Sequence, residues 1–127
     1  MANQICHFEI GCRDSEKTAE FYSKMFEWTM KSDARGTHIR TGGDIGGHIN
    51  SLGHEPHNYT AFYVMVDDVA EALAKAVNLG GKKLVGPVPL PDGAAFGWFA
   101  DPEGNMIGVY TPKQNRPSGE PPKVAAG

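Results

Sequence analysis

The stretch Phe99-Ala100-Asp101-Pro102-Glu103-Gly104-Asn105 places a tight turn between two short apolar runs near the end of the chain. Proline fixes φ at the start of such a turn, and glycine and asparagine tolerate positive φ at its end. Residues 97–100 and 106–110, which flank this turn, are therefore predicted to be strands.

Outward from this turn, the chain repeats one order of elements. Residues 5–10 and 60–66 are each predicted to be a strand, and a helix is predicted to follow each strand. Asp14 or its neighbour Ser15 can cap the first helix, and Asp67 or Asp68 can cap the second. Three more strands are predicted in each half. They lie at 28–31, 37–41 and 45–50 in the first half, and at 83–85, 97–100 and 106–110 in the second. A Pro- and Gly-rich loop is predicted over 86–93. A strand–helix–three-strand unit that recurs with a shift of 54 residues between Asp14 and Asp68 is the strongest fold signal in the sequence.

Composition and charge exclude several classes of protein. The chain has 127 residues, 40% of them hydrophobic, and a net charge of −3, so it is predicted to fold into a soluble globular protein. Its lysines and arginines are scattered, which argues against a nucleic-acid partner, and no apolar run is long enough to cross a membrane. No secretory signal is visible, so a cytoplasmic location is expected.

One domain is predicted over residues 1–112, with module one at about 4–53 and module two at about 58–112. Residues 113–127 form a tail rich in proline and glycine without periodicity. We expect this tail to lack regular structure.

Several motifs together resemble the vicinal-oxygen-chelate superfamily of glyoxalases, bleomycin-resistance proteins and extradiol dioxygenases. The turn quoted first resembles that family's F-x-D-P-x-G-N hairpin, and Phe26-Glu27-Trp28 resembles its F-G-W turn, with Glu27 in place of glycine. The resemblance covers residues 5–111 and is closest to glyoxalase-related proteins without an assigned function. It implies an α+β fold in which two βαβββ modules form a curved eight-stranded mixed sheet, a cup with the helices outside.

The resemblance also implies a divalent metal held on the first and last strand of each module. His7 is at the first of these positions, whereas Ala61, Gly47 and Gly108, at the other three, have no donor atom. Gly47 is the repeat partner of Gly108 by the shift of 61 residues that superposes the turn residues Gly43-Asp44 on Gly104-Asn105. His48 is one residue from Gly47 and is expected to need a bulge to reach the cup, because a shift of one residue reverses the face of a strand. No cofactor is therefore expected.

The alternative is a site for Mn, Fe, Zn or Ni formed by His7, His48 and Glu9. A structural alternative for each residue is kept open. His7 could be a hydrogen-bonded residue of the cup, and Glu9 could pair with Arg40. A true glyoxalase is not expected, because glycines replace its glutamate ligands.

The cup is expected to bind a small organic molecule, and an aromatic one would suit its lining, because period-two counting turns many rings toward it. The alternative is that these rings fill the cup or are buried in a dimer interface. His7 or Glu9 is the expected general base and Tyr63 a hydrogen-bond donor to an oxyanion. The remaining predicted ligand-binding residues are Tyr59, Trp98, Tyr110, Arg40 and Met106. The alternatives are a metal-dependent lyase, isomerase or dioxygenase using His7 and His48, and a drug-sequestering binding protein. The resemblance implies a homodimer.

Overall fold

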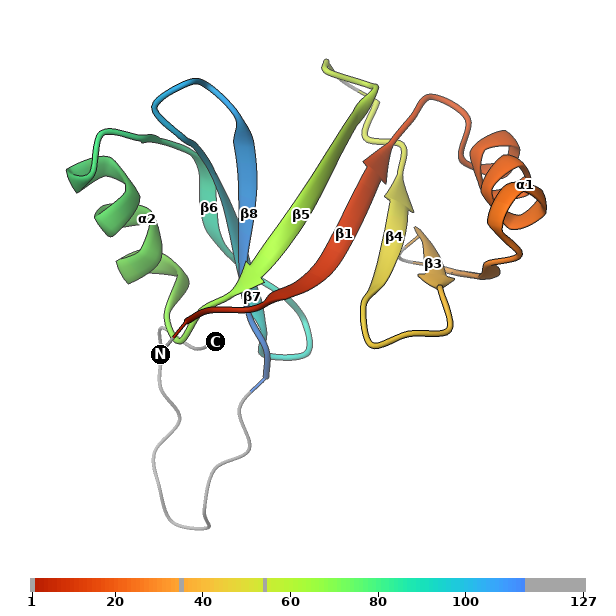
Figure 1. Cartoon of the computed structure of the whole chain (residues 1–127), viewed down its shortest axis with the longest axis horizontal. Coiled ribbons are helices and arrows are strands. Elements are labelled where there is room, and N and C mark those ends of the chain that lie inside the picture. The colour runs from red at the N-terminus through yellow and green to blue at the C-terminus, as the bar shows by residue number, and fades with distance from the viewer. Residues whose placement is uncertain (1, 35, 54, 114–127) are drawn as a thin grey trace, which may run out of the picture. The chain divides into compact units, whose positions relative to one another are not determined.

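The structure, a computed structural model, describes residues 2–34, 36–53 and 55–113 (Figure 1). All but the first residue of the predicted tail lies outside these ranges. The elements follow one another as β1 (Ile5–Gly11), α1 (Ser15–Phe26), β2 (Thr29–Asp33), β3 (Gly36–Arg40), β4 (Gly46–Asn50), β5 (Tyr59–Met65), α2 (Val69–Asn78), β6 (Lys82–Pro89), β7 (Ala95–Ala100) and β8 (Met106–Thr111). Neither helix is long and apolar enough to span a membrane.

The strands form a mixed sheet in the order β2-β3-β4-β1-β5-β8-β7-β6. β1 is parallel to β4 and β5 is parallel to β8, whereas the remaining described pairs are antiparallel. The predicted α+β class, with eight strands in a mixed sheet and two helices, is confirmed.

The chain divides into two compact units, and each repeats the same internal arrangement. The N-terminal unit spans Ile5–Phe62, and the C-terminal unit combines Met1–Gln4 with Tyr63–Gly127. In the N-terminal unit, β4 lies between the parallel β1 and the antiparallel β3, and β8 lies in the same way between β5 and β7 in the C-terminal unit. The repeat seen in the sequence is therefore a repeat of strand pairing.

Both helices begin at an aspartate cap. The Asp14 carboxylate accepts a hydrogen bond from the Lys17 backbone N–H at 3.0 Å, and Asp68 accepts one from Glu71 N–H at 3.1 Å. These side chains satisfy backbone donors that have no partner within the first turn of a helix. α1 ends at Glu27, whose φ of 59° lies in the left-handed region that favours glycine.

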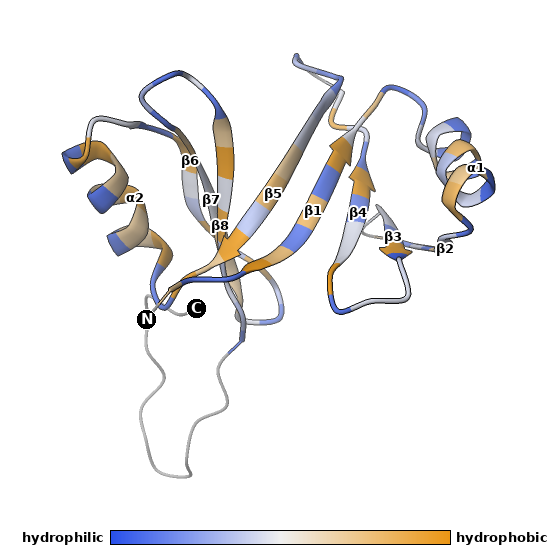
Figure 2. Ribbon diagram, viewed as in Figure 1, coloured by the Kyte–Doolittle hydropathy of each residue, from blue (hydrophilic) through white to orange (hydrophobic). Residues whose placement is uncertain are grey.

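A separate apolar core fills each unit. In the N-terminal unit, Cys12, Ile39 and Ile49 are buried and pack with Phe8, Ile10, Ala19, Trp28 and Met30. In the C-terminal unit, Val69 and Leu73 of α2 pack against Ala95 and Val109 of the sheet. Figure 2 shows β1 banded in alternating colours, because its apolar side chains face the core and its polar side chains face away from it.

One predicted boundary was wrong. The first half of the Pro- and Gly-rich loop expected over 86–93 belongs to β6, which continues to Pro89 and pairs with β7. The pairing contains two register irregularities, and Gly86 there has a φ of 97° that only glycine adopts easily. Glycine and proline therefore shape an irregular strand here instead of ending it.

Candidate functional site: a buried carboxylate and two paired histidines

The polar residues of β1 and β4 share one face of the N-terminal unit. In the parallel register, Glu9 pairs with His48 and Phe8 pairs with Gly47. A Cβ built on Gly47 would lie 2.6 Å from the Phe8 ring, so this glycine faces the core side. The expectation that His48 needs a bulge was therefore wrong, because regular pairing already places it on the face of His7 and Glu9.

The repeat explains the error. In the C-terminal unit Tyr63 pairs with Gly108, as Glu9 pairs with His48 in the N-terminal unit. The repeat partner of Gly108 is therefore His48, with a shift of 60 residues instead of the 61 expected. Of the four family positions, His7 and His48 carry donor atoms, and Ala61 and Gly108 carry none.

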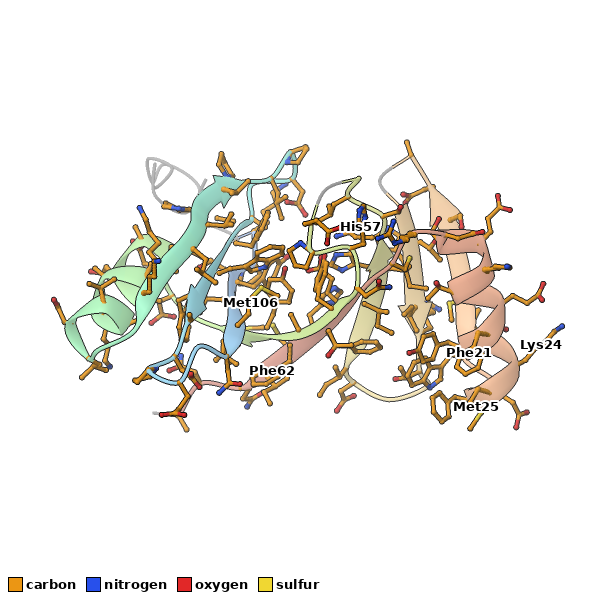
Figure 3. The ribbon with its side chains drawn as sticks, turned by 90° about the horizontal axis from the view of Figure 1, so that it is seen from above. Phe21, Lys24, Met25, His57, Phe62 and Met106 are labelled. Atoms are coloured by element: carbon orange, nitrogen blue, oxygen red, sulfur yellow. The ribbon has the colours of Figure 1, made fainter. Side chains whose placement is uncertain are left out.

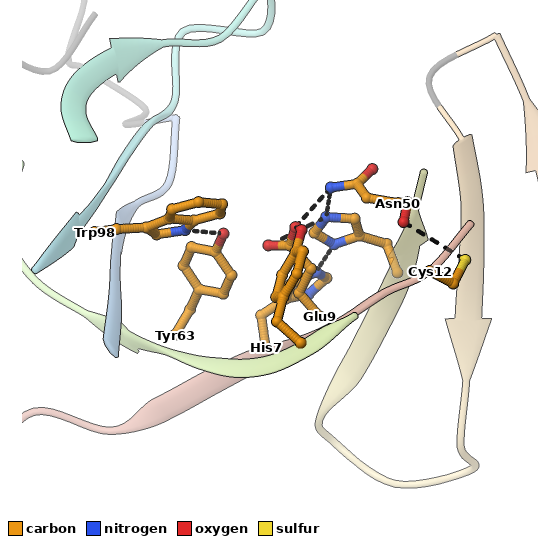
Figure 4. A network of polar contacts seen from close by, with 8 residues as sticks. His7, Glu9, Cys12, Asn50, Tyr63 and Trp98 are labelled. Carbon is orange, nitrogen blue, oxygen red and sulfur yellow. Dashed lines mark hydrogen bonds and ion pairs between the residues drawn. The ribbon is translucent and has the colours of Figure 1, made fainter. Parts of the chain in front are cut away.

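Glu9 is the centre of a polar network (Figure 4). Its side chain is fully buried, and it accepts hydrogen bonds from the Tyr59 hydroxyl and from Asn50 Nδ2, the latter at 2.6 Å. His48 Nε2 lies 3.6 Å from Glu9 Oε1. On the other side of the ring, His48 Nδ1 lies 2.6 Å from His7 Nε2. One continuous chain of polar contacts therefore joins Tyr59, Glu9, Asn50, His48 and His7.

The contacts of Asn50 indicate where the protons lie. Asn50 Nδ2 is 2.6 Å from a Glu9 carboxylate oxygen and 3.0 Å from His48 Nε2. The reverse orientation of the amide would place its oxygen against the carboxylate, two acceptors in contact, so the nitrogen must face Glu9. The amide then donates to both partners, and His48 Nε2 is an acceptor. It follows that His48 carries its proton on Nδ1 and donates it to His7 Nε2.

Burial keeps both imidazoles neutral. It lowers the pKa of His7 to about 4, with a smaller contribution from the nearby His48. Burial also lowers the pKa of His48, although the Glu9 charge acts in the opposite direction. The 3.6 Å contact between His48 and Glu9 is therefore not an ion pair at neutral pH. Burial, with the hydrogen bond to Glu9, raises the pKa of Tyr59, so its hydroxyl keeps its proton.

The proposed ligand set of His7, His48 and Glu9 does not fit a three-ligand metal site. Two imidazole nitrogens bound to one metal at about 2.0–2.1 Å lie about 2.8–3.4 Å apart, whereas His7 Nε2 and His48 Nδ1 are 2.6 Å apart. Glu9 contacts the other nitrogen of His48, which points away from His7. Within the described residues, no group of three or more His, Cys, Asp or Glu side chains is arranged to hold a metal ion.

Further polar residues extend this face across β3 and β2. His38 pairs with His48 and with Lys31, and its Nε2 lies 3.2 Å from Asp33 Oδ2. Arg40, a predicted ligand-binding residue, is exposed on β3, and in the described residues it forms no ion pair with Glu9. The alternative in which Arg40 neutralises Glu9 is therefore wrong.

Sequence reasoning missed Asn50, and it missed the pairing of the exposed His38 with His48. Period-two counting could have found Asn50, because it follows His48 by two residues on β4. His38 could be added only once the register between β3 and β4 was known. Tyr59 was predicted to bind the ligand directly, and the structure shows it bonded to Glu9.

The other predicted residues lie in the C-terminal unit. The Tyr63 hydroxyl accepts a hydrogen bond from Trp98 Nε1 at 2.7 Å, and the Phe96 ring contacts both rings at centroid distances of 6.3 and 6.4 Å. Tyr110 and Met106 are half-buried on β8. This unit therefore presents aromatic rings, with Tyr63 at the repeat position of Glu9.

Two glycines make room for the tyrosines of the two units. A Cβ on Gly11 would lie 2.0 Å from the Tyr59 ring, and one on Gly108 would lie 2.5 Å from the Tyr63 ring. Since real Cβ atoms do not approach so closely, each ring lies where only glycine fits.

Comparison with known proteins assigns the fold to a family. The sequence profile of the Glyoxalase/Bleomycin resistance protein/Dioxygenase superfamily matches residues 4–109. A glyoxylase-like domain-containing protein of Didymella fabae is 32% identical over 119 residues, covering 85% of this chain and 93% of the relative. The chain therefore belongs to the Glyoxalase/Bleomycin resistance protein/Dioxygenase superfamily.

Solved structures share the fold at low sequence identity. A hypothetical protein from Bacillus halodurans C-125 superposes with a TM-score of 0.67 at 14% identity, over 93% of this chain and 100% of that one. A Streptomyces coelicolor methylmalonyl-CoA epimerase in complex with 2-nitronate-propionyl-CoA gives 0.60 at 16% identity, over 87% and 98%. At such identities the likeness extends to the fold alone.

Proposed function

We propose that the chain binds a small organic molecule carrying neighbouring oxygen atoms at the paired histidines, and exchanges a proton with it without a complete metal site. The observation that carries this proposal is the contact between His48 Nδ1 and His7 Nε2, with Glu9 and Asn50 on the far side of His48. A ligand that separates the two rings meets one hydrogen-bond donor and one acceptor side by side. A hydroxy-carbonyl compound matches this pair.

The protonation states support the same proposal. Both imidazoles are neutral at neutral pH, so His7 Nε2 can accept a proton while His48 Nδ1–H donates to a carbonyl oxygen. The charge of Glu9 favours the protonated form of both rings. Glu9 itself is fully buried, so it is proposed as a positioning residue and not as the base that meets the ligand.

A separate proposal, for the C-terminal unit by itself, is that its rings bind an aromatic group. Tyr63, Phe96 and Trp98 form a ring surface on which an aromatic group could stack. Tyr63 is a hydrogen-bond donor to an oxyanion in this proposal. Tyr110 and Met106 of this unit, and Arg40 of the N-terminal unit, are further candidates for contact with the ligand of their own unit.

The test uses chelator-treated protein and a panel of small aromatic hydroxy-ketones and keto acids, in buffered D₂O. We expect saturable binding by ligand-observed NMR, and deuterium incorporation next to the carbonyl that is lost in His7→Ala and His48→Ala. Glu103→Gln, in the exposed hairpin turn, is the matched control. Binding without deuterium incorporation would leave a binding protein, such as a drug-sequestering one, and no binding by the panel would contradict the proposal.

A metal-dependent lyase, isomerase or dioxygenase is the second candidate function. It is favoured by the neutrality of both rings and by the position of Glu9 beside the remote nitrogen of His48, because a metal-bound histidine commonly donates its other ring N–H to a carboxylate. Binding would require His48 to carry its proton on Nε2 instead of Nδ1, and the two ring nitrogens to move apart from 2.6 Å. Only His7 and His48 would hold the metal. Mass-spectrometric metal analysis of untagged protein decides: about one Mn, Fe, Zn or Ni per chain, lost in His7→Ala, would favour this candidate over the first.

The homodimer is likewise a proposal. Phe21 and Met25 of α1 are 60% and 61% exposed, and Figure 3 shows them with Lys24 on this helix. Large apolar side chains exposed together are typical of an interface. Sedimentation velocity should give twice the chain mass, and Met25→Lys should reduce it to that of a monomer.

A further inference from the structure

The C-terminal unit contains a cavity of about 360 Å³ that the site above does not use. Side chains of α2 and of β5, β7 and β8 line it. The apolar members of this lining include Val64, Val66, Ala72, Ala76, Leu79 and Phe99. A volume of several hundred cubic ångströms with an apolar wall is the usual form of a small-molecule site.

The repeat shows why this space is open. In the N-terminal unit, Tyr22 stacks on Trp28 with ring centroids 5.9 Å apart, and Phe26 stands 4.9 Å from the same tryptophan. The shift of 54 that superposes the helix caps places Ala76 at the position of Tyr22 and Gly80 at that of Phe26. The cavity therefore lies where the other unit packs its own aromatic rings against its helix.

The cavity wall carries one charge of each sign, from Lys75 and Asp101. Lys75 lines it, is exposed, and makes no side-chain ion pair or hydrogen bond within the described residues. The Asp101 carboxylate, which lines it too, is already bonded to the amide and the backbone N–H of Asn105, both at 2.9 Å. These hydrogen bonds leave Asp101 charged but occupy its oxygens, so Lys75 is the charged group whose donors are open to a ligand.

We propose that this cavity binds a flat aromatic carboxylate, with the ring in the space opposite Ala76 and the carboxylate at Lys75. The ring takes the volume that Tyr22 and Phe26 fill in the other unit, and the ammonium pairs with the acid. This site lies on the helix side of its own sheet and is independent of the paired histidines.

The test is a titration of the protein with 2-naphthoate, followed by chemical shifts in ¹H–¹⁵N NMR spectra. We expect saturable shifts centred on Val64, Ala76, Leu79 and Phe99. Neutral 2-naphthamide should bind more weakly at the same residues. Lys75→Gln should weaken naphthoate about two- to fivefold, as loss of an exposed ion pair does, and leave naphthamide unchanged.

A filling variant tests the cavity itself. Ala76→Tyr restores the residue of the other unit and should weaken both compounds at least about tenfold, because the ring space is taken. Ala74→Tyr adds the same ring at an exposed position of α2 and should bind as wild type does. If Ala76→Tyr does not fold, judged by its thermal melt, the Lys75→Gln comparison decides.

Three results would overturn the proposal. Shifts confined to the exposed α1 residues Phe21 and Met25 would place the compound elsewhere. Equal affinity of Ala76→Tyr and wild type would show that the cavity is not the site. A wild-type dimer that dissociates in Ala76→Tyr, without naphthoate binding, would assign the cavity to a second copy of the chain.

Discussion

His48 lies opposite Glu9 across the parallel strands β1 and β4, with its Nε2 3.6 Å from the buried carboxylate. Its other nitrogen meets His7. The His48 ring therefore lies between the Glu9 carboxylate, which solvent does not reach, and His7, which is only partly buried. The predictions below test this connection and the backbone that supports it.

Two substitutions of Glu9 distinguish the contribution of its hydrogen bonds to stability from the contribution of its charge. Glu9→Ala leaves the buried Tyr59 and Asn50 donors without their acceptor, and should lower the free energy of unfolding by about 2–4 kcal/mol. Glu9→Gln keeps an acceptor oxygen for both donors and should cost less than about 1 kcal/mol. Urea denaturation measures both, and equal losses would contradict the network described.

The lowered pKa of His7 predicts how stability depends on pH. The unfolded state takes up a proton near pH 6.5 and the folded state near pH 4, so the unfolded state binds more protons between these values. This stabilisation is complete above pH 6.5 and is lost as the pH falls to 4. Because His7 is partly exposed, we expect a loss of about 1–2 kcal/mol.

Unfolding free energies from pH 4 to 8 test this pH dependence. His7→Gln should show a smaller loss over the same range, since it removes the titrating group. A His7 Cε1 proton resonance that titrates at or above pH 6.5 would contradict the lowered pKa.

Gly11→Ala should disturb the network without touching a polar side chain. The added Cβ would lie 2.0 Å from the Tyr59 ring, so the ring must move and its bond to Glu9 is broken. We expect a loss of about 2–4 kcal/mol. Gly43→Ala is the matched control, because its Cβ would meet only Thr41 Oγ1 at 3.9 Å. In a Tyr59→Ala background, the cost of Gly11→Ala should largely disappear.

Glu27→Gly should stabilise the protein. Glu27 ends α1 with a φ of 59°, a conformation that costs an ordinary L-residue about 1 kcal/mol and glycine much less. A gain of about 0.5–1 kcal/mol in chemical denaturation is expected. Glu16→Gly, in the first turn of the same helix, should instead lower the free energy of unfolding by about that amount.

Features set by neighbours in the sequence were predictable. Asp14 and Asp68 cap their helices as expected, and the alternation of β1 placed His7 and Glu9 on one face. These features depend on bonds and periodicities within a few residues. For the same reason the hairpin between β7 and β8 was found from its turn residues.

Features set by pairing between distant residues were not predictable. Aligning the repeats by their turns misplaced the register of β4 by one residue, which exchanged Gly47 and His48 between the two faces. The role of Asn50 depends on Glu9, 41 residues away. Likewise, β6 continues past Gly86 because β7 supplies its partners, which no local pattern records.

The exchange of Tyr22 for Ala76 between the repeats has a consequence for how the two halves evolve. Two copies of a duplicated module begin with the same packing and the same polar residues. In this chain the two copies now differ in both. In the first half, aromatic rings fill the space between helix and sheet, and an ionisable network lies on the opposite face of the sheet. In the second half, the uncharged Tyr63 and Trp98 replace that network, and the space beside the helix is open. A substitution that leaves one half stable will therefore destabilise the other half at the matching position. Whether a residue tolerates substitution should depend on the half in which it lies and not on its position in the repeat.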